Sequence, residues 1–472
     1  MEPYMEFMTG FESTYIPQHD VDVVTLTGHD ERYADDLRLV RDAGVRRLRY
    51  PVLWHQIERE PGRLDWARTD ATMAELRHLG LDPIVDLIHH TSFPRWIKGG
   101  MANPDFPRLH ARWAAAFAER YPWVRRYTIF NEPFATTLFC GNTGTWYPFY
   151  EGKDHFYPMI VNVARSIRAA TEAVVRVRPD AIIVHVDTCE GHTAVGLEPS
   201  AGSLPDTAAA SLVSGPDIET RYRDGLPVEE TDCLTFVRYL NDRRFVFLDL
   251  LLGRVDADHP LFALLAEHAG REAVEDFRDR PARIDLLGLD YYAHSEYQFA
   301  PSGPTCPSRA PVGFAALARE YHARYGLPIA LTETNIRGFA SDRVSWLKHM
   351  VEQCEELERE GLPFGGFTWF PFIDSTDWDS LLRNPRRNVD PVGIYWLDAE
   401  RLDRHESILS EAFAGLARGR ITGADLPAFA LMEPVAEHLD GYRRFMDHWD
   451  WEAPQHLPPW APRSSSWPCL RV

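Results

Sequence analysis

The chain is poor in cysteine and has no long hydrophobic run. No apolar stretch approaches the roughly 18 residues that a transmembrane helix requires, so we expect no membrane span. The N-terminal stretch MEPYMEFMTGFE carries acidic residues where a signal peptide has a basic patch and an apolar segment. The six cysteines are scattered and form no CxxC pair, which indicates reduced thiols rather than a disulfide framework. Together these features predict a cytoplasmic protein.

Positive charge is also scarce. The formal net charge is −20, and lysine occurs only at positions 98, 153 and 348, so nearly all basic residues are arginine. An acidic surface disfavours binding to nucleic acid or to anionic membranes. We therefore expect neither nucleic acid nor a membrane as a partner.

What the chain does contain is a regular alternation of short β-branched runs with segments of helical period. Strands are expected at residues 7–10, 45–53, 83–88, 124–130, 181–186, 284–289, 328–332 and 364–369. Helices are expected at 30–43, 66–79, 107–120, 157–178, 230–252, 258–278, 312–325, 341–360 and 403–418. Repeated βα units imply parallel strands with right-handed crossovers. Eight such units predict an α/β fold, a single (β/α)₈ TIM barrel over residues 1–420.

Two stretches break this alternation. Residues 190–228 are rich in Gly, Pro, Ser and Ala, and we expect a long loop there, after the fifth strand. Residues 421–472 form a C-terminal extension that ends in a tail rich in Pro and Trp. We expect this extension to pack on the barrel or on a partner chain, and the second case would make the protein a homo-oligomer.

Polar residues gather at the carboxyl ends of the expected strands, where barrels of this kind carry their chemistry. Glu132 ends the fourth strand and Glu333 ends the seventh, roughly across the barrel mouth. Hydrolysis of a glycosidic bond needs two such carboxyls, one to protonate the departing oxygen and one to stabilise or trap the sugar carbon. The pair therefore predicts an enzyme. The other polar or aromatic strand-end residues are Arg49, His89, His90, Asn131, Asp187, Glu190, Asp290, Tyr291, Tyr292 and Trp369.

Six motifs, in order along residues 7–415, resemble glycoside hydrolase family 1, the β-glucosidase-like family of retaining (β/α)₈ enzymes. TIFNEP resembles the acid/base motif of the family, and LTETN resembles its nucleophile motif. RYPVLWHQI resembles Arg-Phe-Ser-Ile-Ser-Trp-Ser-Arg-Ile, and LIHHTSFP resembles Leu-Tyr-His-Trp-Asp-Leu-Pro. GLDYYAHS resembles Gly-Ile-Asn-Tyr-Tyr-Thr-Ser, and VGIYWLD resembles Phe-Gly-Leu-Tyr-Tyr-Val-Asp.

The resemblance implies a retaining β-glycosidase with no metal or organic cofactor. Glu132 would be the general acid/base and Glu333 the nucleophile. Arg49 and Tyr292 would hold the Glu333 carboxylate and keep it ionised, because a nearby guanidinium favours the charged form. The substrate would be a small β-glycoside or the end of an oligosaccharide.

The resemblance also implies contacts to the sugar. Asn131 would bind the 2-hydroxyl, a contact that strengthens in the transition state. His90 would bind another ring hydroxyl, and Trp369 would form the floor of the glycone site. The segment WFPFIDSTDW is one residue longer than the family pattern Trp-Ser-Leu-Leu-Asp-Asn-Phe-Glu-Trp. Asp377 then stands where the family Glu reads the 4- and 6-hydroxyls, and Trp378 is expected to contact the sugar.

Two further departures fall in the sugar-recognition region. The family opens with Gly-x-Ala-Thr-Ala-x-Tyr-Gln, whose Gln clamps two sugar hydroxyls, whereas this chain reads GFESTYIPQ, leaving Glu12 or Gln18 as substitutes. Thr91 and Ser92 replace the Trp-Asp pair of the family after the third strand. These differences predict a modified or differently configured sugar.

Three other functions fit parts of the pattern. A transglycosylase would share the covalent intermediate, and the sequence does not separate it from a hydrolase. A barrel that binds carbohydrate without catalysis would be expected to lack one of the glutamates, and both are present. A metal-dependent barrel hydrolase could use His89, His90, Asp187, Glu190 and His192. Such sites usually have a His-x-His pair on one strand face, whereas consecutive histidines point to opposite faces.

Overall fold

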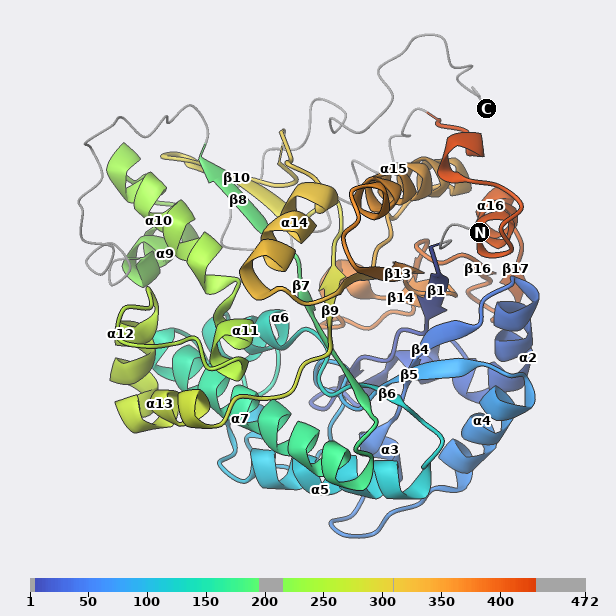
Figure 1. Ribbon diagram of the computed structural model, residues 1–472, viewed down its shortest axis with the longest axis horizontal. Helices are drawn as coiled ribbons and strands as arrows, with labels where there is room; N and C mark the ends of the chain where they lie inside the picture. Colours follow the sequence, from blue (N-terminus) through green and yellow to red (C-terminus); the bar gives the residue numbers. More distant parts are fainter. Residues whose placement is uncertain (1–4, 195–214, 309, 430–472) are drawn as a thin grey trace.

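The computed structural model describes residues 5–194, 215–308 and 310–429. Eight parallel strands close into a barrel with helices outside it, which confirms the (β/α)₈ prediction (Figure 1). Each strand pairs with the next barrel strand along the chain, and the first pairs with the last. In chain order the strands are β1 (Phe7–Gly10), β4 (Arg47–Pro51), β5 (Asp82–Asp86), β6 (Arg126–Thr128), β7 (Ile182–Thr188), β9 (Leu286–Asp290), β12 (Ile329–Glu333) and β13 (Phe364–Trp369).

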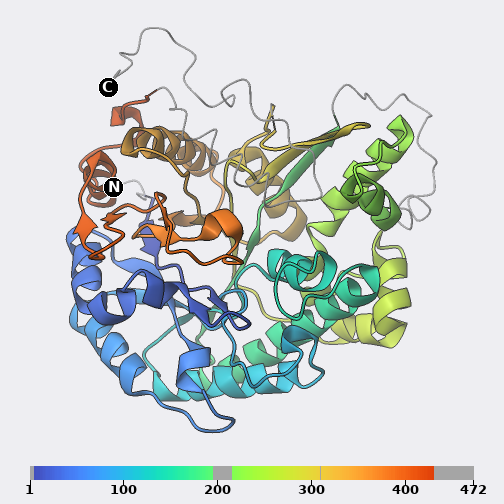
Figure 2. The same cartoon turned by 180° about the vertical axis from the view of Figure 1, so that it is seen from behind.

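The helices surround the barrel, with α2 and α4 on one edge and α12 and α13 on the opposite edge in both views (Figures 1 and 2). The long outer helices are α2 (His29–Asp42), α4 (Ala67–His78), α5 (Phe106–Arg120), α7 (Lys153–Val177), α10 (Glu230–Arg243), α13 (Arg271–Asp279), α14 (Phe314–Tyr325), α15 (Ala340–Arg359) and α16 (Ile408–Ala417). The shorter ones are α1 (Val23–Leu26), α3 (Trp54–Ile57), α6 (Pro133–Thr137), α9 (Gly215–Arg223), α11 (Val246–Leu251) and α12 (Phe262–Leu265).

Three segments differ from the sequence prediction. The helix expected at 230–252 is divided into α10 and α11 at Arg244 and Phe245, where the Phe245 N–H bonds the carbonyl of Asp242, three residues back, at 3.3 Å. The helix expected at 258–278 is divided into α12 and α13 by a wider turn at Ala266–Gly270.

The expected loop at 190–228 contains a strand and a helix. β8 (Gly191–Ala194) pairs in parallel with β10 (Glu296–Ala300), which pairs with β11 (Gly303–Thr305), and α9 follows. The rest of that segment, residues 195–214, lies outside the described residues.

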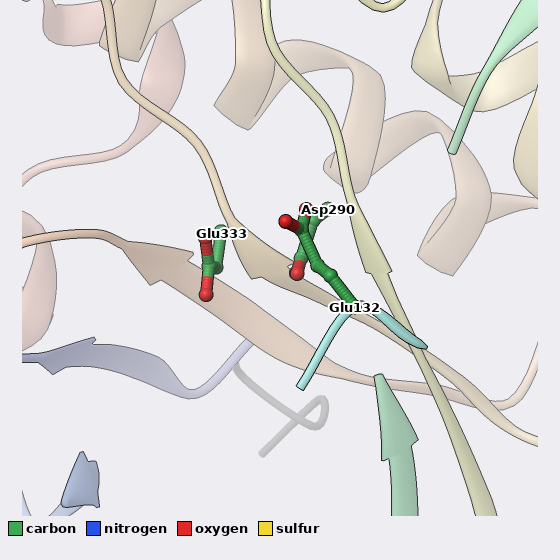
Figure 3. A group of neighbouring side chains, drawn as sticks. All are labelled: Glu132, Asp290 and Glu333. Carbon is green, nitrogen blue, oxygen red and sulfur yellow. The ribbon is translucent and has the colours of Figure 1, made fainter. Parts of the chain in front are cut away.

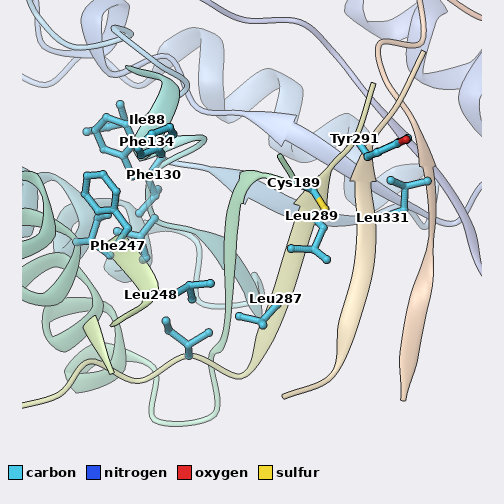
Figure 4. Close-up of a cluster of buried hydrophobic side chains, with 14 of the residues drawn as sticks. Ile88, Phe130, Phe134, Cys189, Phe247, Leu248, Leu287, Leu289, Tyr291 and Leu331 are labelled. Carbon is cyan, nitrogen blue, oxygen red and sulfur yellow. The ribbon is translucent and has the colours of Figure 1, made fainter. Parts of the chain in front are cut away.

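The buried side chains of the barrel strands belong to two apolar clusters, one inside the barrel and one between the barrel and its helices. Met8, Ile84, Val184 and Val186 come from strands that are not all adjacent, yet they form one buried cluster, which therefore fills the barrel interior. Leu287, Leu289 and Leu331 pack instead into the outer core beside the helices, as Figure 4 shows together with Phe247 and Leu248 of α11. Burying one such side chain contributes about 1.5–3 kcal/mol. Because successive side chains of β9 point to opposite faces of the sheet, its inward face carries Gly288 and then, at the barrel mouth, Asp290.

Short two-stranded ladders lie outside the barrel sheet. They are β2 (Tyr15–Ile16) with β3 (Val21–Asp22), β14 (Ser375–Thr376) with β15 (Val389–Asp390), and β16 (Trp396–Leu397) with β17 (Arg404–His405). β14 and β15 contribute Ser375 and Asp390 to the pocket described below. Within the described residues, no helix is long and apolar enough to cross a membrane.

The start of the C-terminal extension contacts the barrel helix α15. Lys348 donates to the carbonyl of Gly423 at 2.9 Å, and Ser345 Oγ bonds both the N–H and the carbonyl of Phe429. The Pro- and Trp-rich tail lies outside the described residues, so its predicted packing and the predicted boundary at residue 420 remain predictions.

Candidate active site

A pocket opens at the carboxyl ends of the barrel strands. Five of the residues predicted to act there line it: His90, Glu132, Tyr292, Glu333 and Trp378. Arg49 and Asn131 are buried next to it and contact each other and the Glu333 region. Trp369 and Asp377 do not line it.

Glu132 reaches the pocket from the turn between β6 and α6. Its N–H donates to the carbonyl of Val186 at 3.1 Å, and Asn131 bridges the neighbouring chain segments on both sides. Glu132 adopts the left-handed conformation, with φ 44°, at the start of α6, and Pro133 takes the first helical position. A non-glycine residue in this conformation is uncommon and is found where a side chain must be held in place. The Glu132 carboxylate lies 3.6 Å from Nε2 of His90.

Glu333 reaches the same pocket from the end of β12. The pairing of β12 with β9 is irregular between Leu331 and Glu333, and such irregularities reorient side chains near active sites. Arg49, only 1% exposed, forms an ion pair with Glu333 and donates to Asp86 Oδ2 at 2.8 Å. The Tyr292 hydroxyl donates to Glu333 Oε2 at 2.6 Å. The two side chains predicted to hold Glu333 therefore both contact it.

The surroundings of the two glutamates separate their protonation states. Burial raises the pKa of Glu132 well above its ordinary value, and the nearby carboxyls of Asp290 and Glu333 raise it further. Burial also raises the pKa of Glu333, but there Arg49 and the Tyr292 hydroxyl oppose the rise. Glu132 therefore holds a proton more readily than Glu333, which is the division that a general acid and a nucleophile need.

Tyr292→Phe is expected to move the acidic limb of the pH profile of kcat/KM upward by about one to two pH units. A hydrogen bond to a charged group contributes about 1.5–3 kcal/mol, and one pKa unit corresponds to about 1.36 kcal/mol. Without the hydroxyl the pKa of Glu333 rises, so the nucleophile becomes ionised only at higher pH. Initial rates on an aryl glycoside across the pH range measure the shift.

The neighbouring tyrosine provides a matched control. Tyr291 is buried on the outer side of β9, and its hydroxyl donates to Glu296 at 2.8 Å. Tyr291→Phe should leave the acidic limb in place. An unchanged limb in Tyr292→Phe would show that this hydroxyl does not control the ionisation of Glu333.

Both histidines at the end of β5 lie at the mouth, although the motif favoured His90 alone. His90 Nδ1 pairs with Thr136 Oγ1 at 2.9 Å, and burial lowers the pKa of His90 well below its ordinary value, so the ring is neutral. His89 lies 3.2 Å from Asp86 and 3.5 Å from Glu12. Burial lowers the pKa of His89, but these two carboxyls outweigh it and the net change is upward.

Of the two residues suggested as substitutes for the missing Gln, Glu12 lines the pocket and Gln18 does not. One Glu12 oxygen accepts from the N–H groups of Ser13 and Thr14 and from the Thr14 hydroxyl, at 2.8–2.9 Å. Those three donors fix the carboxylate in position. Glu12 is therefore the acidic group that the N-terminal segment brings to the pocket.

Trp369 does not form the floor of the pocket. It is fully buried, and its indole N–H donates to the carbonyl of Val392 at 2.9 Å. The next residue, Phe370, lines the pocket instead, with the Arg49 guanidinium 5.3 Å from its ring centroid. Successive residues of a strand point to opposite sides, so a shift of one residue exchanges the two aromatic side chains.

Asp377 does not point to the pocket either. The backbone there is left-handed, with φ 58°, and the carboxylate accepts N–H bonds from Arg386, Arg387 and Asn388 at 2.9–3.0 Å. The longer loop therefore turns this carboxylate toward its own chain. Trp378 does line the pocket, 5.8 Å from the His90 ring centroid.

Asp377→Asn is expected to lower the free energy of unfolding by about 1–3 kcal/mol. The new amide NH₂ group would point at a backbone N–H that, in the parent protein, donates to a carboxylate oxygen. The ratio of kcat/KM between sugars that differ at the 4- and 6-positions should not change. Thermal unfolding and a substrate panel measure both. Asp379→Asn, in an exposed neighbour, is the matched control and should unfold like the parent. A changed sugar ratio with unchanged stability would restore Asp377 as a sugar contact.

Asn131 is buried, precedes Glu132 in the chain and shares Arg49 with Glu333 as a hydrogen-bond partner. Its Oδ1 accepts from Arg49 at 2.6 Å, and its Nδ2 has no hydrogen-bond partner among the described residues. An unsatisfied buried amide is costly. Asn131 does not line the pocket, so its predicted contact with a sugar hydroxyl stays a prediction.

Several pocket residues received no role from the sequence. Asp290 is the most important, because one of its oxygens lies within 4.8 Å of an oxygen of each glutamate. In the family pattern Gly-Ile-Asn-Tyr-Tyr-Thr-Ser, which GLDYYAHS resembles, this position is Asn. The signal was the acidic residue at a strand end. Other pocket residues without a predicted role include His294, Tyr297, Asn335, Arg337, Phe370 and Asp390, and Glu190, named above only as a possible metal ligand, also lines the pocket.

One group of three carboxylates in the described ranges could hold a metal ion. Single oxygens of Glu132, Asp290 and Glu333 all lie within 4.8 Å of one another (Figure 3). The histidine-based set is not gathered in this way. Asp187 points away from the barrel interior and accepts the N–H groups of Phe134 and Thr188.

No protein-family model matches the chain. It is 21% identical over 388 residues to β-glucosidase A of Thermotoga maritima, covering 74% of this chain and 78% of that protein. It is 20% identical over 387 residues to a 1,4-β-D-glucan glucohydrolase of Thermotoga neapolitana, covering 74% and 82%.

The fold matches solved structures of the same kind. A family 1 β-glucosidase from Thermotoga maritima superposes with a TM-score of 0.69 at 16% identity, covering 89% of this chain and 98% of the other. A β-glucosidase from the same organism, in complex with methoxycarbonyl-substituted glucoimidazole, gives a TM-score of 0.69 at 15% identity with the same coverage. In sequence and in fold, the chain resembles the family 1 β-glucosidases of Thermotoga.

Proposed function

We propose that this chain is a retaining β-glycosidase that hydrolyses a small β-glycoside or the end of an oligosaccharide. One observation carries the proposal: oxygens of Glu132 and Glu333 lie within 4.8 Å of each other in one pocket. Retaining enzymes place their carboxyls about 5–5.5 Å apart, whereas inverting enzymes need about 6.5–9.5 Å to admit a water molecule. Single oxygens within 4.8 Å are compatible with the retaining separation, and the contacts of Arg49 and Tyr292 with Glu333 support its role in direct attack on the sugar.

In the first step Glu333 attacks the anomeric carbon while Glu132 donates its proton to the departing oxygen. Arg49 and Tyr292 hold the Glu333 carboxylate at a fixed angle. In the second step the Glu132 carboxylate removes a proton from water, which attacks the same carbon and releases Glu333. The net result is two inversions, so the sugar leaves with its original configuration.

The names of the similar proteins support a β-linked glucoside or glucan end as the general substrate class. The site itself differs from the family pattern at Glu12, Asp377 and the loop that carries Trp378. These differences affect the choice of sugar and leave the two catalytic glutamates in place.

A simple aryl β-glucoside is expected to be a poor substrate, with kcat/KM below the about 10⁴–10⁸ M⁻¹s⁻¹ range of efficient enzymes. The reason is that Glu12 replaces a neutral amide as the N-terminal contact and no carboxylate from the Asp377 position reaches the pocket. Steady-state rates on aryl glycosides of several configurations measure the preference. A β-glucoside value inside that range would contradict this expectation.

The proposed function is tested by the configuration of the first product. NMR of a fresh reaction should detect the β-anomer before mutarotation produces the α-anomer. Initial release of the α-anomer would establish inversion and overturn the two-step mechanism. A cytoplasmic location and a homo-oligomer are part of the proposal and rest on the sequence features alone.

A further inference from the structure

A third buried carboxylate accompanies the two glutamates in the proposed reaction site. Asp290 is the last residue of β9, and single oxygens of Asp290, Glu132 and Glu333 all lie within 4.8 Å of one another (Figure 3). It is 1% exposed. Its Oδ1 accepts from the Thr332 hydroxyl at 2.6 Å, whereas Oδ2 has no hydrogen-bond partner in the part of the chain that the structure describes.

The cations near the pocket are already paired with other carboxylates. Arg337 forms an ion pair with Asp390, and Arg49 forms ion pairs with Glu333 and Asp86. His89 lies against Asp86 and Glu12. The remaining pocket histidines do not supply charge, because burial lowers the pKa of His294 to about 3 and that of His90 well below its ordinary value.

Glu132 must carry a proton when it acts as the acid, so it needs no cation. Asp290 is then the carboxylate at the reaction centre whose charge has no cationic side chain bonded to it within the described residues. A buried charge without a partner is costly, and proteins avoid it unless a ligand supplies the partner. Burial and the nearby Glu333 raise the pKa of Asp290 well above its ordinary value, although the Arg49 charge opposes the rise. A positive group entering the pocket would take the place of that proton.

We propose that Asp290 binds a protonated amine of the substrate, placed next to the anomeric carbon. The inference rests on the proposed function, since Glu333 then faces the anomeric carbon and Glu132 the glycosidic oxygen. Because Asp290 lies within 4.8 Å of both glutamates, a group that reaches it belongs either to the adjacent sugar carbon, as in a 2-amino sugar, or to the first atoms of the aglycone. An ammonium group has three donors and a compact charge, which suits Oδ2 together with the Oε atoms beside it.

The test compares matched amine-bearing and neutral glycosides, in gluco and galacto configuration. One arm uses aryl 2-amino-2-deoxy-β-glycosides against the 2-hydroxy and 2-acetamido compounds. The other arm uses 2-aminoethyl against 2-hydroxyethyl β-glycosides. For the parent protein, kcat/KM should favour the amine by about 10- to 100-fold in one arm, the effect of a hydrogen bond to a charged group. The arm that responds identifies which part of the substrate carries the amine.

Three variants locate the effect. Asp290→Asn should abolish the preference for the amine, and Asp290→Glu, which keeps the charge, should retain a preference. Glu190→Gln removes another carboxylate from the same pocket and should leave the amine-to-neutral ratio unchanged. Thermal unfolding of each variant verifies that it is folded. A parent protein with no preference in either arm, or an equal loss of preference in Glu190→Gln, would overturn the role of Asp290.

Binding separates this inference from the proposed reaction. Calorimetry with sulfur-linked glycosides, which resist hydrolysis, measures the amine preference without turnover. If no glycoside is hydrolysed but the amine-bearing ligand binds tighter and Asp290→Asn removes the difference, the cation site stands and the reaction is wrong. If neutral glycosides are hydrolysed with retention and the amine gives no advantage, the reaction stands and the cation site is wrong.

Discussion

Glu333→Gln is expected to lower kcat/KM on every glycoside by on the order of 10⁴–10⁶-fold, because no covalent intermediate can form. The loss should not depend on the leaving group, since the missing group attacks the sugar and not the aglycone. Rates on aryl glycosides of widely different leaving-group pKa measure this. The variant is expected to fold, because Arg49 keeps its ion pair with Asp86. Activity within tenfold of the parent in a folded variant would remove Glu333 from the mechanism.

Glu132→Gln is expected to separate substrates by their leaving groups. Poor leaving groups need protonation, so their kcat/KM should fall by about 10²–10⁴-fold. Dinitrophenolate leaves without a proton, so the first step on a dinitrophenyl glycoside should be nearly unaffected and should appear as a burst. The steady state should then be slow, because no base activates the water.

Small nucleophiles provide the control for that variant. Azide needs no general base, so it should restore turnover of the dinitrophenyl glycoside and yield a β-glycosyl azide. Azide should not restore this turnover in Glu333→Gln, and no β-glycosyl azide should form. Equal losses for good and poor leaving groups in Glu132→Gln would contradict its role as the acid.

The barrel could be predicted because its strands are apolar runs whose ends are marked by polar or turn-forming residues. All eight expected strands are present, for example β4 (Arg47–Pro51) within the expected 45–53 and β13 (Phe364–Trp369) as expected. Each run buries one face inside the barrel and the other under helices, and that double burial leaves an apolar signal in the sequence. The segment 190–228 carries no such signal, and the pairing of β8 with β10 depends on a partner about 100 residues away.

The catalytic pair could be predicted for a related reason. The ends of parallel strands meet at one rim of the barrel, so a polar residue that follows an apolar run is placed with little ambiguity. Arg49 and Tyr292 are placed by the same argument, and both contact Glu333.

The sugar contacts were harder to predict because they depend on single-residue register and on loop conformation. Trp369 and Phe370 exchange sides with one step along the chain, and the sequence does not specify that step. Asp377 is removed from the pocket by a left-handed turn and by three backbone donors from a segment nine to eleven residues later. Asp290 was visible as an acidic strand end, but its lack of a cationic partner emerges only from the packing of its neighbours.

The most direct test of the central claim is the mass of the intermediate in Glu132→Gln. This variant, incubated with a dinitrophenyl glycoside from the substrate panel and quenched with acid, should accumulate one sugar per chain. Peptide mapping should place that sugar on Glu333, in the segment that contains LTETN. An unlabelled protein after a full burst of dinitrophenol, or a sugar on any other residue, would contradict the covalent mechanism with Glu333 as its nucleophile.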